Sequence, residues 1–454
     1  MERFEKLANK DGIVLVSGLM ILALLLIIGA TAYMLSSSDV MISANYKHSE
    51  AAFADAEAGI DFAKAAIENH LEGGGNLPAN VGDVMAIPAT APSGFLFSYS
   101  NLEKTGNNAY TFTSTGNGPQ GATASIITSI KRKPVFDYAV FGDEQVDLKS
   151  STGVFSYNSS DGLPDPDDAS WDDMTTSTGN GDVGSNGDAD AKNDIILNSS
   201  CYVDGDLAQG ADGSPLVEAV VKNSGGVFTG ETTSVGPVDT DPLDIVNDSD
   251  FLNKFADYEA ANDNASITEP ETGAALDTTI ADDGVVLTGP GDYYFDSIQL
   301  GNGDTLTIDA SSGPINIWVR GPVLGDNGSE FAIQNTSDTN KVNINVTEPS
   351  GYAGSTIIDL KNGGDFNPGG HPSHVMIKTD SDATVSIHNG NDTRAVIYAP
   401  FAHVDFDNGS AFYGAVLGKT IALRNSMKVY YDETIKDLAV SKKVELTSWY
   451  QKLE

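Results

Sequence analysis

An uninterrupted apolar segment near the start of the chain constrains its fold more than any other feature. The segment runs from Ile13 to Leu35, inside a stretch from Gly12 to Ser38 that contains no charged residue. About 20 apolar residues span the hydrocarbon core of a bilayer as a helix, because a helix satisfies its backbone polar groups internally. Cations precede the segment at Arg3, Lys6 and Lys10. This bias predicts a single span with a cytoplasmic N-terminus and the remaining residues outside.

A secretory signal peptide is the alternative interpretation of the same segment. Ala30-Thr31-Ala32 has the small residues of a cleavage site for such a peptide. The apolar run is long for a signal peptide, and the pattern that follows it favours one continuous helix.

The residues from Val40 to Leu71 predict an amphipathic continuation of this helix. They contain no proline, and their one glycine is Gly59. Apolar side chains recur at spacings of three and four, which places them on one face of a helix. This stripe consists of Phe53, Ala56, Ile60, Ala63, Ile67 and Leu71. The helix is expected to end before Gly73 and to extend about 90 Å from Ile13.

The start of the chain resembles the N-terminal region of PilX-type minor pilins of type IV pili. The likeness rests on Gly12 before the apolar run, on Asn45, and on the block Ala51-Ala52-Phe53-Ala54-Asp55-Ala56-Glu57-Ala58-Gly59. It implies that residues 1–12 are a leader and that prepilin peptidase cuts between Gly12 and Ile13, leaving an N-methylated Ile13. It also implies other pilins, the peptidase and an inner-membrane assembly platform as partners, and a final location in a pilus at the cell surface.

One position departs from the major pilins. They carry Glu at the fifth mature position, where this chain has Ser17. A carboxylate in an apolar fibre core is costly unless it is paired, so its absence implies a different place in the assembly. Tip pseudopilins of type II secretion also lack this Glu, which favours a position near the tip. The residues expected to carry assembly are Ser17, Phe53, Glu57, Ile60 and Ile67.

Residues 73–134 are expected to complete a pilin-like module as a small antiparallel sheet on the helix of residues 13–72. Short alternating runs separated by Asn- and Gly-rich turns predict the strands. These runs are Phe95–Ser100, Tyr110–Thr115 and Ala122–Ile130.

Residues 135–438 predict a mainly β domain, with a right-handed parallel β-helix, or solenoid, favoured over a β-sandwich. Short β runs recur about every 8–11 residues between Gly, Asn and Asp turns, which both folds allow. Ala395–Glu433 resembles solenoid-like C-terminal domains attached to PilX-type proteins. Phe251–Ala261 is expected to form a short surface helix. Residues 439–454 are expected to form a cap, with Trp449-Tyr450 on the last coil. The clearest runs are Thr305–Ile308, Ile315–Val319, Val342–Val346, Val375–Ile377, Val385–Ile387, Ala395–Tyr398, Val404–Phe406 and Ile421–Leu423.

Charge and cysteine content limit the ligands of the chain. It has 25 Lys and Arg against 64 Asp and Glu, a net charge of −39, which opposes binding to nucleic acid and other polyanions. The lone Cys201 excludes an internal disulfide and multi-cysteine metal sites. His371 and His374 suggest a transition-metal pair, or two solvated side chains. Calcium is the one cofactor considered, because acidic loops supply oxygen ligands at Asp165, Asp167, Asp168, Asp188 and Asp190.

The pattern as a whole predicts a structural subunit without enzymatic activity. No catalytic motif with a suitable context is present, and the arginines of the β domain share no pattern that would bind an acidic substrate. The expected role is a pilin-like subunit that displays a large β domain, with adhesion as a further expectation. The alternative is a membrane-anchored extracellular β-helix protein that acts on or binds neutral glycans, unrelated to pili.

Overall fold

The fold divides into two compact units, which we name by their main elements. The helix unit comprises Met1–Lys133 with Lys442–Glu454, and the solenoid unit comprises Pro134–Ser441. The computed structural model describes residues 2–452 except 74, 88–90, 107, 162–165, 167–170, 174, 188–193, 199, 211–220, 224, 235–237, 239, 242, 244, 246–248, 282, 362, 389–391, 408, 410 and 439. At residues 2–12, 221–223, 234, 249–250, 437, 440–441 and 452 it describes the backbone alone.

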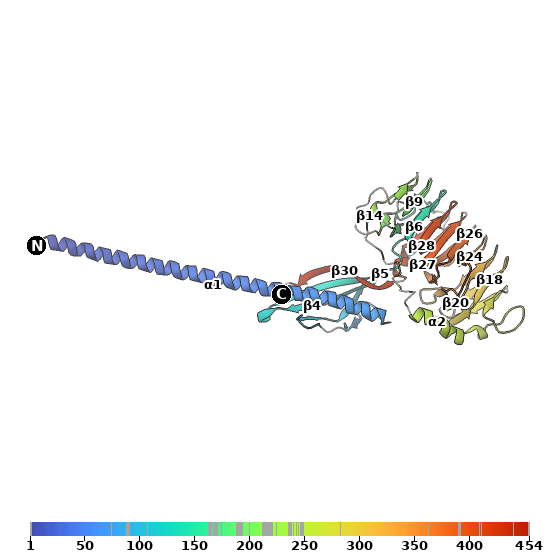
Figure 1. Cartoon of the computed structure of the whole chain (residues 1–454), viewed down its shortest axis with the longest axis horizontal. Coiled ribbons are helices and arrows are strands. Elements are labelled where there is room, and N and C mark those ends of the chain that lie inside the picture. Colours follow the sequence, from blue (N-terminus) through green and yellow to red (C-terminus); the bar gives the residue numbers. More distant parts are fainter. Residues whose placement is uncertain are drawn as a thin grey trace. The chain divides into compact units, whose positions relative to one another are not determined.

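One long helix, α1 (Glu2–Glu72), begins the helix unit (Figure 1). Its 71 residues contain no proline and correspond to about 105 Å of helix. The helix ends where the Gly73 N–H donates to the carbonyl of Asn69 at 3.0 Å. The sequence predicted a continuous helix through the apolar segment and the amphipathic stripe, and the structure shows that continuity.

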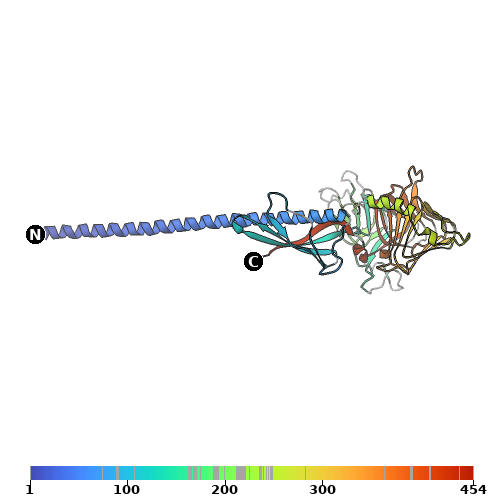
Figure 2. The same ribbon diagram turned by 90° about the horizontal axis from the view of Figure 1, so that it is seen from below.

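An antiparallel sheet packs on the second half of α1 (Figure 2). Its strand order is β1-β3-β4-β5-β30, and β2 pairs with β4. Among the described residues it has six strands, where the sequence predicted three. The predicted runs correspond to β2, β4 and β5. The bounds are β1 (Val84–Met85), β2 (Phe97–Tyr99), β3 (Leu102–Gly106), β4 (Ala109–Asn117), β5 (Thr123–Pro134) and β30 (Val440–Lys452), with the 3₁₀ turn η1 (Pro119–Gly121) between β4 and β5.

The expectation that the C-terminal tail caps the last coil is wrong. The tail forms β30, the edge strand beside β5 in the helix unit. Val444 is 1% exposed in the same core as Ile60 and Ile67, and Trp449 lies 5.9 Å from Phe53 between ring centroids. The tail buries its apolar side chains against α1 and completes this sheet, so it is unavailable to a coil of the solenoid.

The solenoid unit winds into three parallel strand ladders, faces A, B and C (Figure 1). Every strand pair in its described residues is parallel, which confirms the solenoid over the sandwich. Face A stacks β14 (Thr232–Ser234), β11 (Leu207–Gln209), β8 (Val183–Ser185), the start of β6 (Val140–Leu148), the middles of β28 (Ala411–Leu423) and β27 (Thr393–Asp407), β25 (Val375–Thr379), β23 (Val342–Val346), β20 (Ile315–Val319) and β17 (Gly291–Phe295).

The other two faces complete each coil. Face B stacks β12 (Val221–Asn223), β9 (Ile195–Leu197), the ends of β6, β28 and β27, β26 (Thr384–His388), β24 (Thr356–Leu360), β21 (Val323–Gly325), β18 (Ser297–Leu300) and β15 (Thr279–Ile280). Face C stacks β13 (Val227–Phe228), β10 (Tyr202–Val203), β7 (Gly153–Tyr157), β29 (Lys428–Asp432), the starts of β28 and β27, Phe366 with a bridge to Thr393 on one side and to Phe331 on the other, and then β22 (Glu330–Gln334), β19 (Thr305–Asp309) and β16 (Val285–Thr288). Short 3₁₀ turns are η2 (Asn264–Ser266), η3 (Pro372–His374) and η4 (Glu433–Asp437).

The coils do not stack in chain order. β6 in the first coil pairs with β8 on one side and with β28, from the last coil, on the other. Likewise β7 pairs with β29. The chain therefore begins and ends the solenoid in neighbouring coils, which explains how β5 and β30 remain neighbours in the sheet of the helix unit although more than 300 residues separate them.

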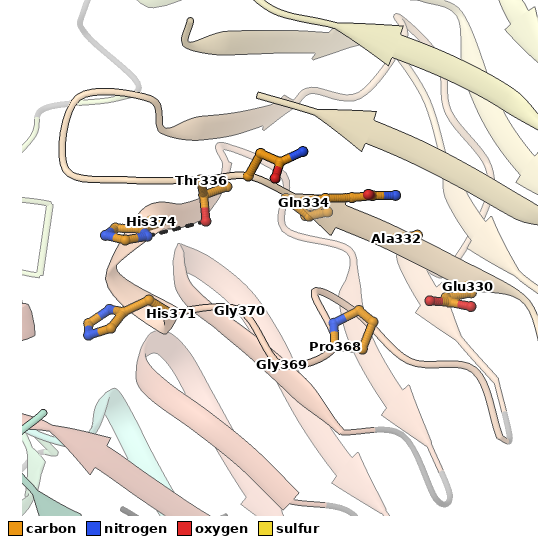
Figure 3. Close-up of a pocket in the computed structure, with 11 residues that line it drawn as sticks. Glu330, Ala332, Gln334, Thr336, Pro368, Gly369, Gly370, His371 and His374 are labelled. Carbon is orange, nitrogen blue, oxygen red and sulfur yellow. Dashed lines mark hydrogen bonds between the residues drawn. The ribbon is translucent and has the colours of Figure 1, made fainter. Parts of the chain in front are cut away.

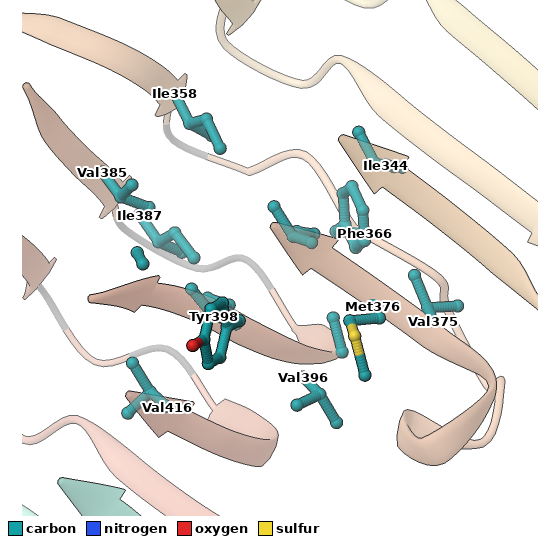
Figure 4. Close-up of a cluster of buried hydrophobic side chains, with 14 of the residues drawn as sticks. Ile344, Ile358, Phe366, Val375, Met376, Val385, Ile387, Val396, Tyr398 and Val416 are labelled. Atoms are coloured by element: carbon teal, nitrogen blue, oxygen red, sulfur yellow. The ribbon is translucent and has the colours of Figure 1, made fainter. Parts of the chain in front are cut away.

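Apolar side chains from the three faces fill the interior of the solenoid. Figure 4 shows Ile358, Val385 and Ile387 of face B gathered opposite Ile344 and Phe366. All five are at most 5% exposed. The alternating β runs of the sequence supply these side chains, and two predicted strands, Ile315–Val319 and Val342–Val346, have the observed bounds.

The short helix α2 (Ser249–Ala260) covers one end of face A. The sequence predicted this surface helix, and Leu252 on its outer side is 43% exposed. On its inner side Phe255 is 1% exposed and meets Trp318 of β20 edge-on, with ring centroids 5.1 Å apart. Tyr258 stacks on the same indole at 5.2 Å. The helix packs on face A because its aromatic side chains cover Trp318, which points outward from β20.

Candidate functional site

The first half of α1 contacts no other part of the helix unit among the described residues. From Ile13 through Tyr46 its large apolar side chains are exposed. An 18-residue window of this segment has a mean hydropathy of 3.0, and the helix is long and apolar enough to cross a membrane. Its hydroxyls are compatible with that setting: the Thr31 hydroxyl donates to the carbonyl of Ile27 at 2.8 Å. We name the exposed apolar surface of α1 from Ile13 to Tyr46 the candidate assembly surface.

The predicted processing and assembly positions lie along this helix. Gly12 and Ile13 are helical, and Ser17 is exposed in the next turn. Cleavage after Gly12 stays a prediction. Further along, Ile60 and Ile67 are buried against the sheet, Phe53 is half-buried beside Trp449, and Glu57 is exposed. The stripe thus serves internal packing, while Ser17 and Glu57 are free to face neighbours.

Small residues allow α1 and the sheet to approach closely. A Cβ added at Gly116 of β4 would overlap the carbonyl oxygen of Ala52 and the amide of Ala56. A Cβ at Gly59 would overlap the Ser114 hydroxyl, which donates to the carbonyl of Ala56 at 2.7 Å. The Ala- and Gly-rich block of the sequence is therefore the contact surface of α1 with β4.

A second candidate site is a pair of polar cavities in the solenoid unit that share His371 and His374. The first cavity, of about 460 Å³, runs along β22 from Glu330 past Gln334 to the histidines (Figure 3). The second, of about 430 Å³, includes Lys341 and Thr434. The two imidazole rings lie 4.8 Å apart between centroids. Figure 3 shows His374 bound to Thr336 across a distance of 3.2 Å between Nδ1 and Oγ1.

The side chain of His371 belongs to a hydrogen-bonded network around the buried Asp432. Its Nε2 lies 2.7 Å from the Ser159 hydroxyl and 3.1 Å from a carboxylate oxygen of Asp432, which is 0% exposed. Its Nδ1 lies 2.8 Å from the Ser373 hydroxyl. Asp432 also accepts hydrogen bonds from the Thr434 N–H at 3.1 Å and from the Ser159 hydroxyl at 2.8 Å. The network ties β29 and the segment after β7 to η3.

This network is not a nucleophilic triad, although it contains Ser159, His371 and Asp432. In a triad the carboxylate holds one imidazole nitrogen and the serine hydroxyl faces the other. Here Ser159 and Asp432 both approach Nε2, while Nδ1 faces Ser373. If Nε2 took a proton from Ser159, no carboxylate at Nδ1 would orient the ring and stabilise its charge. The geometry therefore supports a structural role.

The metal hypotheses find no support in the part of the chain that the structure describes. No group of three or more His, Cys, Asp or Glu side chains there is placed to hold a metal ion. The expected calcium residues Asp165, Asp167, Asp168, Asp188 and Asp190 lie outside the described residues. Nearby, Asp173 accepts hydrogen bonds from Lys428, Trp171 and Tyr430 at 2.5, 3.0 and 3.0 Å, and its pKa is lowered. Cys201 is buried, and its Sγ lies 3.3 Å from the Thr152 hydroxyl.

The half-buried His374 makes stability depend on pH. Burial lowers the pKa of His374, and the nearby His371 and Lys341 act in the same direction, whereas Asp338 opposes them. The unfolded chain therefore binds more protons than the folded chain as pH falls below about 6.5, and folded stability decreases there. We expect the unfolding midpoint to fall between pH 7.5 and pH 5.5 more steeply in the natural protein than in His374→Asn. Thermal unfolding by circular dichroism at both pH values measures this, and equal slopes would contradict it.

Sequence reasoning found the helix residues but missed most of the polar cavity. Lys341, Asp432 and Ser159 converge from three distant segments and belong to no local motif. His371 and His374 were identified by their spacing, but their partners could not be. The sequence predicted Gly-rich turns between the strands of the helix unit but not the contact of Gly116 with α1, because a glycine gives no sign of the backbone it approaches.

Comparisons with known proteins identify two matched regions. Residues 11–61 match the family model described as PilX N-terminal, and residues 248–438 match the model described as Domain of unknown function (DUF7305). None of the curated proteins matches the chain.

Three solved structures are similar at 14% sequence identity each. The competence-associated pilin ComZ from Thermus thermophilus has a TM-score of 0.30, with 90% of this chain and 98% of that chain covered. The DUF3494 domain of ice-binding protein_1 from Shewanella frigidimarina has a TM-score of 0.21, with 66% and 97% covered. The glycosylated ice-binding protein LeIBP from an Arctic yeast has a TM-score of 0.19, with 66% and 93% covered. At TM-scores this low, the three likenesses carry no argument about function.

Proposed function

Because residues 11–61 match the PilX N-terminal family model, as the sequence predicted, we propose that the chain is a minor subunit of a type IV pilus-like filament. The observation that carries this proposal is the division of α1. Its second half is buried on its own sheet, whereas Ile13 to Tyr46 exposes apolar side chains all round. Such a surface needs a membrane before assembly and other apolar helices after it.

The partners follow from this surface. They are the helices of other pilins, with prepilin peptidase and an inner-membrane assembly platform acting beforehand. The cations at Arg3, Lys6 and Lys10 support an N-terminus in the cytoplasm and a solenoid unit outside. With Ser17 in place of an acidic residue, the subunit cannot neutralise the terminal amine of a neighbour through that position, which supports a place near the filament tip.

The solenoid unit is proposed to act by display rather than catalysis. The Ser159–His371–Asp432 network lacks the arrangement of a nucleophilic relay. An adhesive role suits a rigid domain held at the cell surface. The alternative of a protein that binds neutral glycans through aromatic platforms is less favoured, because no Trp, Tyr or Phe in the described part of the solenoid unit is strongly exposed.

Processing tests the filament role. In cells that assemble the natural protein, we expect the mature chain to start at Ile13 and to be found with sheared filaments. Gly12→Val should block cleavage and leave a chain 12 residues longer in the membrane, with at least about a tenfold loss from the sheared fraction. Ala8→Val is the matched control in the leader and should be processed normally. N-terminal sequencing and immunoblotting of both fractions measure this.

The proposal fails if the mature chain begins near Tyr33, as signal-peptidase cleavage would produce, or if uncleaved Gly12→Val enters filaments as efficiently as the natural chain.

A further inference from the structure

The cavity that contains Lys341 has the lining of a ligand site rather than of a packing defect. Its volume is about 430 Å³, within the range of sites for small molecules. Its wall is built from four segments that the solenoid brings together: the segment after β7, the residues before β23, η3, and η4. Ser160, Thr434, His374 and the exposed Asp338 line it together with Lys341.

Lys341 differs from other lysines of the solenoid unit. Lys361 forms an ion pair with Asp326 at 2.7 Å, and Lys428 forms one with Asp173 at 2.5 Å. Among the ion pairs within 4.0 Å that described residues form, none includes Lys341. Its side chain is nevertheless half-buried, and burial lowers its pKa. The carboxylate that acts on it, Asp338, is 94% exposed, so solvent screens that attraction.

The neighbouring groups leave this ammonium without a buried anion. Asp432 is fully buried but is held by His371, Ser159 and Thr434. A half-buried ammonium that lacks such a partner is destabilised by desolvation, and a bound anion would relieve this. His374 lines the same cavity as Lys341, so both side chains can face one ligand.

The charge of the chain restricts the ligand to a small one. A net charge of −39 repels polyanions at long range, but at physiological salt the repulsion is screened beyond about 8 Å. A single carboxylate therefore meets mainly the local charges of the cavity. We propose that this cavity binds a small polyhydroxylated carboxylate, such as a uronic acid, whose carboxylate pairs with Lys341 and whose hydroxyls bond to the polar wall.

Binding of defined probes to the full chain in detergent micelles tests the proposal by isothermal titration calorimetry. Sodium D-galacturonate should bind saturably in the millimolar range, and D-galactose, which lacks the carboxylate, should bind at least about tenfold more weakly. Lys341→Met should reduce galacturonate affinity by at least about tenfold, because the charge is removed while the alkyl chain stays. Lys341→Arg should retain binding. Lys361→Met, on the surface of the same unit, should bind like the natural protein.

The proposal is overturned by any of three results. These are no saturable binding of galacturonate, equal losses in Lys341→Met and Lys361→Met, or binding of inorganic phosphate as tight as that of galacturonate. Unchanged unfolding midpoints of the variants show that they fold. The measurement does not depend on filament assembly, so its failure is distinguishable from failure of the filament role.

Discussion

Gly116→Ala is expected to destabilise the helix unit by about 1–3 kcal/mol, because the added methyl group has no space between β4 and α1. The atoms in its way are the backbone oxygen of Ala52 and the backbone amide of Ala56, which cannot rotate aside as a side chain would. The helix must therefore move away from the sheet, which opens the contact at Gly59 and weakens the hydrogen bond from Ser114 to Ala56. The unfolding midpoint of the helix unit should fall by several degrees.

Gly106→Ala is the matched control for this substitution. Gly106 ends β3 in the same sheet, and a Cβ there meets its nearest neighbour, the Ala109 Cβ, at an ordinary 3.5 Å. Hydrogen exchange of the full chain in detergent micelles locates the effect. Peptides from Ala52 to Ile60 should exchange faster in Gly116→Ala and at the natural rate in Gly106→Ala. Equal exchange in the two variants would show that the close approach of α1 and β4 is not needed for stability.

The sequence predicted those parts of the fold in which neighbours along the chain decide the structure. Ile60 and Ile67 share a helix face by their spacing alone, and they are buried. Val342–Val346 alternates apolar and polar side chains, and it forms β23 with the same bounds. In both cases the periodicity of one element determines which side chains meet the core.

Other parts depend on contacts between distant segments and could not be predicted in this way. The pairing of β6 with β28 joins the first coil to the last, and no local pattern distinguishes it from stacking in chain order. The tail has an apolar, aromatic strand pattern that suits either a coil or a sheet edge, so Trp449 was assigned to the wrong unit. The candidate ligand site could not be predicted for the same reason. Lys341 belongs to no sequence motif, and only the fold brings it into one cavity with His374.

The role of the tail leads to the prediction with the largest expected effect. Val444→Asp should destabilise the helix unit by about 3 kcal/mol or more, because it buries an unpaired carboxylate in an apolar core. Val444 is 1% exposed, and its N–H donates to a carboxylate oxygen of Glu68 on α1 at 3.0 Å. A new carboxylate there would also lie near that of Glu68 and repel it. The second half of α1 would then lose the strand that closes its sheet.

Leu446→Asp is the control, since Leu446 is on the same strand and 41% exposed. Hydrogen exchange of the full chain in detergent micelles separates the two possible locations of the tail. Peptides from Ile60 to Leu71 should exchange much faster in Val444→Asp than in Leu446→Asp, while those from β28 and β29 keep their protection. The opposite pattern, with β28 and β29 exposed and α1 unchanged, would mean that the tail does cap the solenoid. Since β30 follows the solenoid in the chain, the sheet of the helix unit can be completed only after the solenoid has been synthesised. Val444→Asp should therefore also deplete the subunit from sheared filaments although its apolar segment is intact.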